Sequence, residues 1–172
     1  MVSEKWAKIN TFVLDVDGVL TDGSVLCLAS GEQVRTFLVK DGFAIEKALS
    51  AGYHVCVITG GFQEGVRKRL EFLGVKDIFM NVRNKPEVFE KYLIDQNIDP
   101  ENVLYMGDDL PDYEVMSLCG LAACPSDAVE DIKVICHYIS DRAGGKGAVR
   151  DVIEKTLKLQ RKWPLLGNKA NG

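Results

Sequence analysis

Residues 11–23, TFVLDVDGVLTDG, decide the fold of this chain. The first part of the stretch, 11–16, is short, β-rich and largely apolar, which is typical of a parallel strand covered on both faces. Asp15 and Asp17 close this strand, and Gly18 allows the backbone to turn sharply after it. In open parallel sheets ligands bind beyond the carboxyl ends of the strands, so the search for function begins at these two aspartates.

The rest of the chain repeats an alternation of short apolar runs with helix-length segments. The remaining predicted strands are 54–58, 77–80, 102–106, 121–123 and 136–139. The predicted helices are 41–51, 62–73, 86–96, 111–118, 127–133 and 147–159. Repeated strand, helix, strand units favour right-handed crossovers and helices on both faces of one parallel sheet. The sequence therefore predicts an α/β fold, a three-layer Rossmann-like parallel sheet.

One insertion interrupts this alternation directly after the first strand. Two short β-like runs, 24–28 and 33–38, flank the turn sequence ASGE, which predicts a β-hairpin over about 24–38. The insertion is too short for a cap domain, so we expect residues 1–172 to form a single domain without a cap. The last residues, 161–172, are polar and interrupted by proline and glycine, and we expect an extended tail there.

The composition excludes several classes of function. The chain has 172 residues, the length of about one domain. Lys and Arg number 21 against 25 Asp and Glu, and the net charge of −4 gives no overall attraction to nucleic acid or to an anionic membrane. The first ten residues lack the apolar core of a signal peptide, and no run approaches the roughly 18 apolar residues that span a bilayer. We therefore expect a cytoplasmic protein whose five cysteines are reduced and mostly buried.

Polar residues follow three of the predicted strands at the same edge of the sheet. They are Asp15 and Asp17 after the first strand, Thr59, Gly60 and Gly61 after 54–58, and Asp108, Asp109 and Asp112 after 102–106. Each position alone fits helix capping or a turn, but capping does not require paired acids after two separate strands. Repelling carboxylates are tolerated where a cation neutralises them, and Mg²⁺ prefers oxygen ligands. We expect Asp15 and Asp108 to bind a magnesium ion.

The same residues suggest a phosphoryl-transfer mechanism. An ionised Asp15 could attack phosphorus and form an aspartyl-phosphate, while Asp17 could protonate the leaving alkoxide and later deprotonate water. If the strand geometry continues past Asp15, both side chains point the same way. Lys85 precedes a predicted helix, so a point charge and a helix N-terminus could surround the phosphate. Thr59 would add a hydroxyl donor and Gly60 a backbone donor, although Lys85 alone fits a solvated surface residue and Thr59 a turn residue.

Four motifs occur in the order that is typical of one superfamily. They are DVDGVLTDG at 15–23, VITGG at 57–61, Lys85 and GDDLPD at 107–112. This set resembles the signature of the haloacid dehalogenase-like phosphatases, and the resemblance runs over essentially the whole chain. Within that superfamily the chain is most similar to small, nearly capless phosphatases of 3-deoxy-D-manno-octulosonate (KDO) 8-phosphate and related ulosonates. FLVKDGFAI at 37–45 and GGKGAVRD at 144–151 also fit this subgroup.

The resemblance implies a role for each of the principal site residues. It implies Asp15 as the nucleophile and Asp17 as the general acid and base. The Mg²⁺ cofactor would be held by Asp15, the backbone carbonyl of Asp17 and Asp108. The phosphate group would be bound by Thr59 and Lys85.

The resemblance also implies secondary groups and an assembly. Asp109 and Asp112 would orient metal-bound water or Lys85. In relatives of this size a hairpin after the first motif mediates a homotetramer, so that one subunit covers the active site of its neighbour, and the segment 24–38 matches that hairpin. Closure by a partner would exclude bulk water from phosphoryl transfer.

One position departs from the pattern of this subgroup. Many KDO 8-phosphate phosphatases have Arg where this chain has Gly61, and nononate phosphatases of the same subgroup tend to have Glu. Recognition of the sugar carboxylate would then fall to other cations, for which the candidates are Arg67, Lys68, Arg142 and Lys146. Lys146 belongs to GGKG at 144–147, which equally fits a flexible lead-in to the last helix.

The leading hypothesis is a Mg²⁺-dependent phosphomonoesterase that converts KDO 8-phosphate to KDO and inorganic phosphate on the route to lipopolysaccharide. The alternatives are a phosphatase of a nononate (KDN or sialic acid) 9-phosphate, a phosphotransferase that uses the same aspartyl-phosphate, and a non-catalytic oligomeric partner in sugar-nucleotide synthesis. A response-regulator receiver also gathers acids, a threonine and a lysine at strand ends. It lacks the second acid two residues after the nucleophile, which a turnover enzyme needs for proton transfer.

Overall fold

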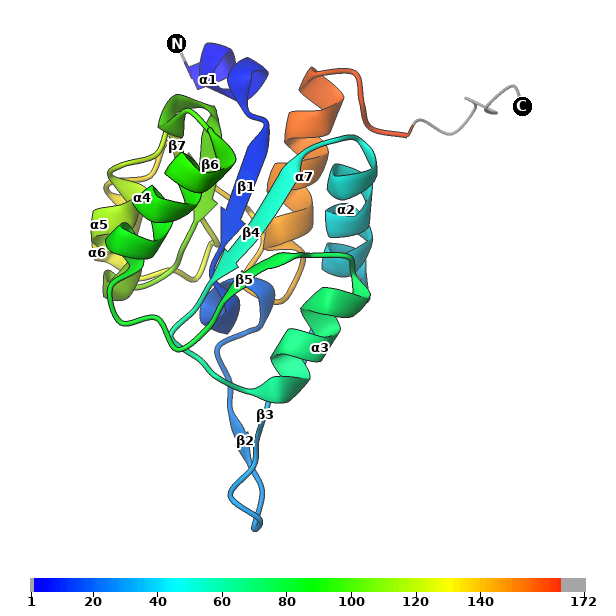
Figure 1. Ribbon diagram of the computed structural model, residues 1–172, viewed down its shortest axis with the longest axis vertical. Helices are drawn as coiled ribbons and strands as arrows, with labels where there is room; N and C mark the ends of the chain where they lie inside the picture. The colour runs from blue at the N-terminus through cyan, green and yellow to red at the C-terminus, as the bar shows by residue number, and fades with distance from the viewer. Residues whose placement is uncertain (1, 165–172) are drawn as a thin grey trace.

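In the part of the chain that the structure describes, six parallel strands form the central sheet, which confirms the α/β fold expected from the sequence. The computed structural model describes residues 2–164. In spatial order the strands are β5 (Asp77–Phe79), β4 (His54–Ile58), β1 (Thr11–Leu14), β6 (Val103–Met106), β7 (Leu121–Cys124) and β8 (Tyr138–Ile139). Strand β1 pairs with β4 on one side and β6 on the other, with Leu14 opposite Val57 and Met106. The strand that leads into Asp15 therefore lies in the middle of the sheet (Figure 1).

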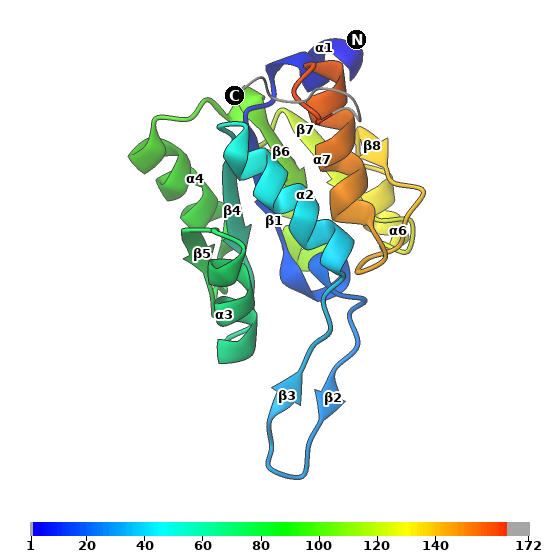
Figure 2. The same cartoon turned by 90° about the vertical axis from the view of Figure 1, so that its right-hand side faces the viewer.

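Helices cover both faces of this sheet. They are α1 (Val2–Lys8), α2 (Val39–Ser50), α3 (Glu64–Phe72), α4 (Lys85–Gln96), α5 (Tyr113–Met116), α6 (Glu130–Lys133) and α7 (Ala148–Leu159). Helices α2, α3 and α7 pack on one face, and α4, α5 and α6 on the other (Figures 1 and 2). Because side chains alternate along a strand, Phe12 and Leu14 join the first core and Val13 joins the second. Within residues 2–164, no helix combines the length and apolar character needed to cross a membrane.

The insertion after β1 is a β-hairpin, as predicted. Strands β2 (Leu26–Cys27) and β3 (Gln33–Val34) pair antiparallel. The hairpin projects from the side of the body where the parallel strands end (Figures 1 and 2). Its apolar side chains at Val25, Leu26 and Leu28 are exposed to solvent. No cap domain is inserted between β1 and β4, where the described chain holds only a short turn, this hairpin and α2.

Two findings near the start of the chain differ from the expectations. The sequence pattern does not indicate α1, yet its Trp6 is only 2% exposed and packs edge-on against Tyr138 with 5.2 Å between the ring centroids. Burial of this one large side chain docks a helix that is too short to show a periodic pattern. Cys27 is exposed on the hairpin, so the expectation of a buried thiol is wrong at this position.

The end of the chain also differs. Residues 161–164 do not extend away from the last helix as expected. The N–H groups of Lys162 and Trp163 donate to the carbonyl of Leu157 at 2.7 and 3.2 Å, which satisfies an acceptor at the end of α7. The remainder of the predicted tail, 165–172, lies outside the described residues.

Candidate active site

The first motif turns abruptly where β1 ends. A tight helical turn occupies Val16–Leu20, and the Asp15 carboxylate accepts a hydrogen bond from the N–H of Val16 at 2.7 Å. Inside the turn Gly18 has a φ of +80°, a region that favours glycine. A Cβ atom at Gly18 would also lie 1.9 Å from Oδ2 of Asp108. The turn therefore holds the first motif directly against the acidic motif that follows β6.

A buried lysine lies between two carboxylates beside this turn. Lys85 is the first residue of α4, and its Nζ lies 2.9 Å from Oδ2 of Asp15 and 2.7 Å from Oδ1 of Asp112. The hydroxyl of Tyr105 donates to the same Asp112 oxygen at 2.8 Å, and the N–H of Asp108 donates to the other at 3.2 Å. The Lys85 side chain is only 5% exposed. Its ammonium group is therefore fixed in place and largely removed from water.

Even with Lys85 nearby, ionisation of the buried carboxyl groups at this site is unfavourable. Burial, and then the nearby Asp112 carboxylate, raise the pKa of Asp15 to about 7, although Lys85 opposes the shift. Burial, and then the Asp15 carboxylate, raise the pKa of Asp108 to about 7. Burial acts to lower the pKa of Lys85, but its two carboxylate partners raise it above the usual value. The site thus holds more negative than positive charge, and a further cation would stabilise the ionised acids.

The residues present fit a magnesium ion. One carboxylate oxygen from each of Asp15, Asp108 and Asp112 lies within 4.8 Å of the others. The Asp112 oxygens are already bonded to Lys85, Tyr105 and a backbone N–H, whereas the Asp108 carboxylate accepts no hydrogen bond from the residues that the structure describes. Asp15 and Asp108 therefore retain free acceptor capacity. Carboxylate oxygens with room for additional water or phosphate ligands suit Mg²⁺.

The end of β4 adds hydroxyl and backbone donors next to β1. Thr59 is buried, and its N–H donates to the carbonyl of Phe79 at 2.9 Å. The Thr59 Oγ1 accepts a hydrogen bond from the N–H of Gly61 at 3.1 Å, which closes a tight turn around Gly60. The Thr59 carbonyl accepts from the N–H of Val82 at 3.0 Å. Three bonds thus fix this turn, and the Thr59 hydroxyl proton stays free to donate to a ligand.

Asp17 has a partner that the sequence did not suggest. Arg35, directly after β3 in the hairpin, donates from Nε to Oδ1 of Asp17 at 3.1 Å and from Nη2 to Oδ2 at 3.3 Å. The strand does not continue past Asp15, so two parallel side chains on one extended strand are not formed. The carboxylates of Asp15 and Asp17 are instead held by different cations. Only the charge and length of Arg35 could have drawn attention to it, because no sequence pattern shows which hairpin side chain folds back.

The four cations predicted to read the substrate lie elsewhere. Three form pairs of their own: Arg67 with Glu71 at 4.0 Å, Lys68 with Glu64 at 3.9 Å and Lys146 with Asp22 at 3.4 Å. Arg142 is exposed and lines a groove along α7 together with Lys146. Within residues 2–164, none of the four bonds to Asp15, Asp17 or Asp108. Asp109 is exposed and accepts from the N–H of Leu110 at 2.7 Å, so it caps a turn.

The glycines before α7 pack against the turn of the first motif. The N–H of Gly145 donates to the carbonyl of Val19 at 3.0 Å, and the N–H of Gly144 donates to Asp127 Oδ1 at 2.9 Å. A Cβ atom at Gly144 would lie 1.9 Å from the carbonyl oxygen of Gly18. The interpretation of this segment as a flexible lead-in is therefore wrong, because it packs tightly against the turn after Asp15.

Comparison with known proteins agrees with this geometry. Residues 37–120 match a family model for haloacid dehalogenase-like hydrolases. The 3-deoxy-D-manno-octulosonate 8-phosphate phosphatase KdsC of Salmonella typhi is 38% identical over 161 residues, which cover 94% of this chain and 86% of the relative. The KdsC of Escherichia coli K12 has the same identity and coverage.

Solved structures of similar proteins share the fold over nearly the whole chain. The 3-deoxy-D-manno-octulosonate 8-phosphate phosphatase of Yersinia pestis superposes with a TM-score of 0.92 at 33% identity, covering 94% of this chain and 87% of that one. The phosphatase of the same name from Moraxella catarrhalis was solved with magnesium, phosphate and KDO. It superposes with a TM-score of 0.90 at 30% identity, covering 93% of this chain and 92% of that one.

Proposed function

The chain belongs to the haloacid dehalogenase-like hydrolases, in the family of the KDO 8-phosphate phosphatases, and from this we propose that it hydrolyses KDO 8-phosphate to KDO and inorganic phosphate. The observation that carries the proposal is the buried Lys85, held between Asp15 and Asp112 beside the free carboxylate of Asp108. Such a group of acids around one lysine suits a dianionic phosphate only together with a divalent cation. Magnesium is accordingly the cofactor of the proposed reaction.

The phosphate would bind between the magnesium ion and Lys85. Bound by Asp15, Asp108 and the backbone carbonyl of Asp17, magnesium would supply the positive charge that draws phosphoryl oxygens to the acidic site. Lys85 would donate to another phosphoryl oxygen, since its ammonium is fixed and carries three N–H donors. The hydroxyl of Thr59 and the N–H of Gly60 would complete the phosphate site at the start of the neighbouring loop.

The chemistry would take place on the two aspartates of the first motif. Asp15 Oδ would attack phosphorus and form an aspartyl-phosphate, while the bond from phosphorus to the sugar oxygen breaks. Asp17 would give its proton to that oxygen, which leaves as the free sugar. The Asp17 carboxylate would then take a proton from water as the water oxygen attacks phosphorus. This second step releases inorganic phosphate and restores both side chains.

We further propose that the protein acts as a homotetramer in the cytoplasm, with each site covered by a neighbouring subunit. The exposed apolar side chains of the projecting hairpin support this assembly, because Leu26 alone is 62% exposed. Contiguous apolar surface on a soluble protein commonly marks an interface. Water would be excluded from the phosphate once a partner's surface covers the strand ends.

Phosphate release tests the proposed function. We expect turnover of KDO 8-phosphate with Mg²⁺, loss of turnover in EDTA, and a fall of at least about 10⁴-fold in kcat for Asp15→Asn. Asp95→Asn, an exposed acid on α4, serves as the matched control and should retain full activity. The same assay with KDN 9-phosphate tests the nononate alternative, because the substrate with the higher kcat/KM is the preferred one. Turnover that survives EDTA or Asp15→Asn would contradict the mechanism.

A further inference from the structure

We propose that Arg35 determines the preference of this enzyme for acidic sugar phosphates, because its guanidinium binds the carboxylate of the substrate. The inference rests on the proposed function, which supplies a substrate with a carboxylate on its leaving group. It names a residue outside the four shared motifs. It also assigns a task to the hairpin beyond contact with other subunits.

Lys85 and Arg35 contact different aspartates of the site, and this difference places Arg35 near the sugar. Lys85 contacts Asp15, whose carboxylate meets phosphorus in the proposed reaction. Arg35 contacts Asp17, whose carboxylate meets the oxygen that leaves with the sugar. The guanidinium therefore lies on the sugar side of the reacting bond and the ammonium on the phosphate side. A carboxylate on the sugar would then pair with Arg35 while Lys85 contacts the phosphate.

The environment of Arg35 suits an anionic ligand. Its side chain is only 6% exposed, while that of Asp17 is 38% exposed. The guanidinium gives two bonds to Asp17, and its Nη1 donates to the backbone carbonyl and to Oε1 of Gln33, both at 3.3 Å. A guanidinium has five N–H donors in a planar fork, so one donor is left, and the exposed Gln33 side chain can give up another. Two donors in one plane match a carboxylate.

The loop after β4 supplies no charged side chain next to Asp17. Gly61 has no side chain, and a Cβ atom there would lie 3.9 Å from Oδ2 of Asp17 and 2.9 Å from Oε1 of Gln63. The same Asp17 oxygen lies 3.3 Å from Nη2 of Arg35. A side chain at position 61 and the guanidinium of Arg35 would thus both lie next to Oδ2 of Asp17. Because Gly61 carries no side chain, Arg35 provides the positive charge beside Asp17.

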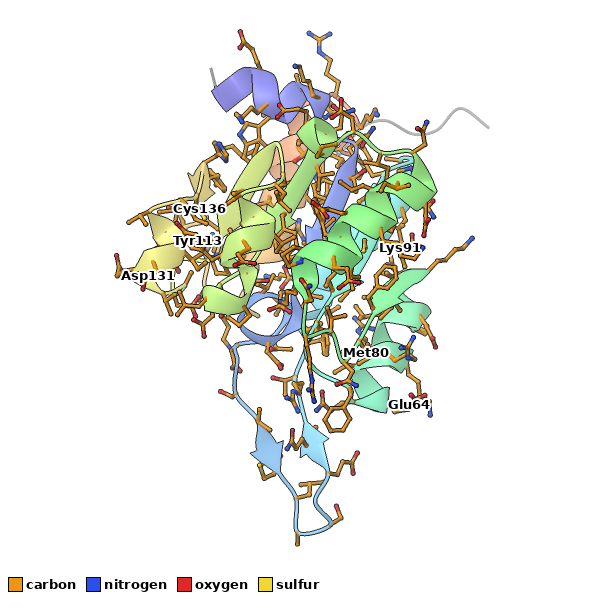
Figure 3. All side chains as sticks on the ribbon, turned by 60° about the vertical axis from the view of Figure 1, so that its left-hand side comes forward. Glu64, Met80, Lys91, Tyr113, Asp131 and Cys136 are labelled. Carbon is orange, nitrogen blue, oxygen red and sulfur yellow. The ribbon has the colours of Figure 1, made fainter. Side chains whose placement is uncertain are left out.

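The space beside Arg35 is large enough for a sugar acid. A cavity of about 720 Å³ lies between the hairpin and the first turn of α3, and its lining includes Gln33, Arg35, Phe62, Gln63 and Arg69. Volumes of about 300 to 1,000 Å³ are usual for small-molecule sites. The Gln63 amide donates to Gln33 Oε1 at 3.4 Å, so the hairpin and α3 are bridged at this cavity. Glu64 begins α3 on the side from which the hairpin projects (Figure 3).

The test compares a substrate that has a carboxylate with one that lacks it. Phosphate release from KDO 8-phosphate and from ribose 5-phosphate is measured with Mg²⁺ for the wild type, Arg35→Gln and Arg35→Lys. We expect Arg35→Gln to lower the ratio of the two kcat/KM values about 100-fold, because a site built for a charged hydrogen bond loses its donor. Arg35→Lys keeps the charge and should lose about 10-fold. Lys91→Gln removes an exposed charge from α4 and should leave the ratio unchanged (Figure 3).

A merely positional role for Arg35 gives a different result. If Arg35 only held Asp17 in place, both substrates would lose activity equally and the ratio would stay constant, which overturns the inference. A double variant sharpens the test, because Arg35→Ala with Gly61→Arg returns a guanidinium to the same corner. Recovery of the ratio by about 10-fold over Arg35→Ala supports carboxylate binding. A double variant whose ratio stays at the value of Arg35→Ala contradicts it.

Binding without turnover separates this inference from the proposed function. Titration calorimetry with KDO itself reads the carboxylate site alone, and we expect the affinity of Arg35→Gln to fall about 10- to 100-fold. Absence of phosphate release from KDO 8-phosphate in the wild type would refute the proposed function. Equal KDO affinity in the wild type and Arg35→Gln would refute the role of Arg35, whatever the enzyme hydrolyses.

Discussion

The two cations of the candidate site are held in opposite ways. Lys85 comes from a helix that packs on the sheet, and its partners Asp15 and Asp112 have side chains only 11% and 1% exposed. Arg35 comes from a hairpin that leaves the body, and its partner Asp17 is 38% exposed. The phosphate side of the site is thus part of the core, and the sugar side is assembled from a surface insertion.

This difference separates chemistry from selectivity. Groups that must be fixed within fractions of an ångström are best placed on rigid elements with packed neighbours. Groups that choose between substrates tolerate a mobile support, since loops vary without disturbing the core. We therefore expect changes on the phosphate side to cost both turnover and stability. Changes on the hairpin side should alter substrate preference or assembly at little cost to folding.

Removal of Lys85 should have the largest effect. Lys85→Met leaves the carboxylates of Asp15 and Asp112 buried without a counter-charge, and breaking such a pair costs about 3–5 kcal/mol of unfolding free energy. Loss of a donor to the phosphoryl group should also lower kcat about 10³-fold. Urea denaturation and phosphate release measure the two effects. Lys91→Met, on the exposed face of the same helix, should change stability by less than about 0.5 kcal/mol.

Lys85→Arg separates the effect on stability from the effect on turnover. The guanidinium keeps the positive charge, so most of the stability should return, but its planar fork cannot reproduce a point charge between two acids. Turnover should stay at least about 10-fold below that of the wild type. Full activity in Lys85→Met would show that the buried lysine serves the fold alone, and the contrast with Arg35 would disappear.

A substitution on the hairpin tests the other half of the contrast. Leu26→Ser removes an apolar side chain that is 62% exposed in the single chain, so we expect the subunit to fold normally. Sedimentation velocity should show dissociation of the proposed tetramer at micromolar concentration. Val39→Ser is the control, because Val39 is 75% exposed but lies on α2. Equal assembly states for Leu26→Ser and the wild type would remove the hairpin from the interface.

Much of the fold follows from local patterns that the sequence displays openly. The apolar strands and the glycines that end the helices set the alternation of the α/β sheet, and the hairpin follows from its turn residues. The expected convergence of Asp15 and Asp108 needed only the rule that parallel strands end at one edge. Thr59 follows from the same rule, and Lys85 follows from its place directly before a predicted helix. Each of these inferences depends on neighbours in sequence or on sheet topology, both of which a pattern can express.

The remaining features depend on how a particular side chain packs over a distance. The hairpin was expected, but the return of Arg35 to Asp17 depends on the angle at which the hairpin leaves the sheet. The tight packing of Gly144 against Gly18 joins segments that are 126 positions apart in the sequence. From the sequence alone, a glycine before a helix is interpreted as a flexible lead-in. Only the structure shows that a side chain at Gly144 would collide with the carbonyl oxygen of Gly18. Helix α1 likewise depends on distant contacts, namely burial of Trp6 and a hydrogen bond from Lys5 to the carbonyl of Gly120.

The packing of Gly144 offers the next test on the rigid side. Gly144→Ala would place a Cβ 1.9 Å from the Gly18 carbonyl, so the turn after Asp15 must shift. We expect a loss of about 1–3 kcal/mol in unfolding free energy, and a clear fall in kcat, because overpacked backbone moves the nucleophile. Gly65→Ala in α3 meets no atom within 4 Å and should stabilise by about 0.5–1 kcal/mol. Equal behaviour of the two variants would show that the glycine loop does not support the first motif.

A third buried acid shows what burial does without a lysine partner. Asp41 in α2 is 1% exposed; its Oδ1 accepts from the N–H of Arg150 at 2.8 Å, and its Oδ2 has no hydrogen-bond partner within the described chain. Burial raises the pKa of Asp41 from 3.8 to about 6, although Arg150 opposes the shift. An acid with a raised pKa in the folded state favours folding while it is protonated. Its ionisation therefore costs stability as the pH rises from about 4 to 6.

Asp41→Asn should remove this pH dependence and give the smallest of the expected effects. The amide oxygen still accepts from Arg150, and an uncharged NH₂ replaces the unpartnered Oδ2. We expect the variant to match the wild type at pH 4 and to exceed it by about 1–2 kcal/mol at pH 8. Urea denaturation at both pH values measures the difference, with the exposed Asp95→Asn as control. A variant less stable than the wild type at pH 8 would mean that the Asp41 charge holds the start of α7, and that burial of an acid need not be offset by a lysine.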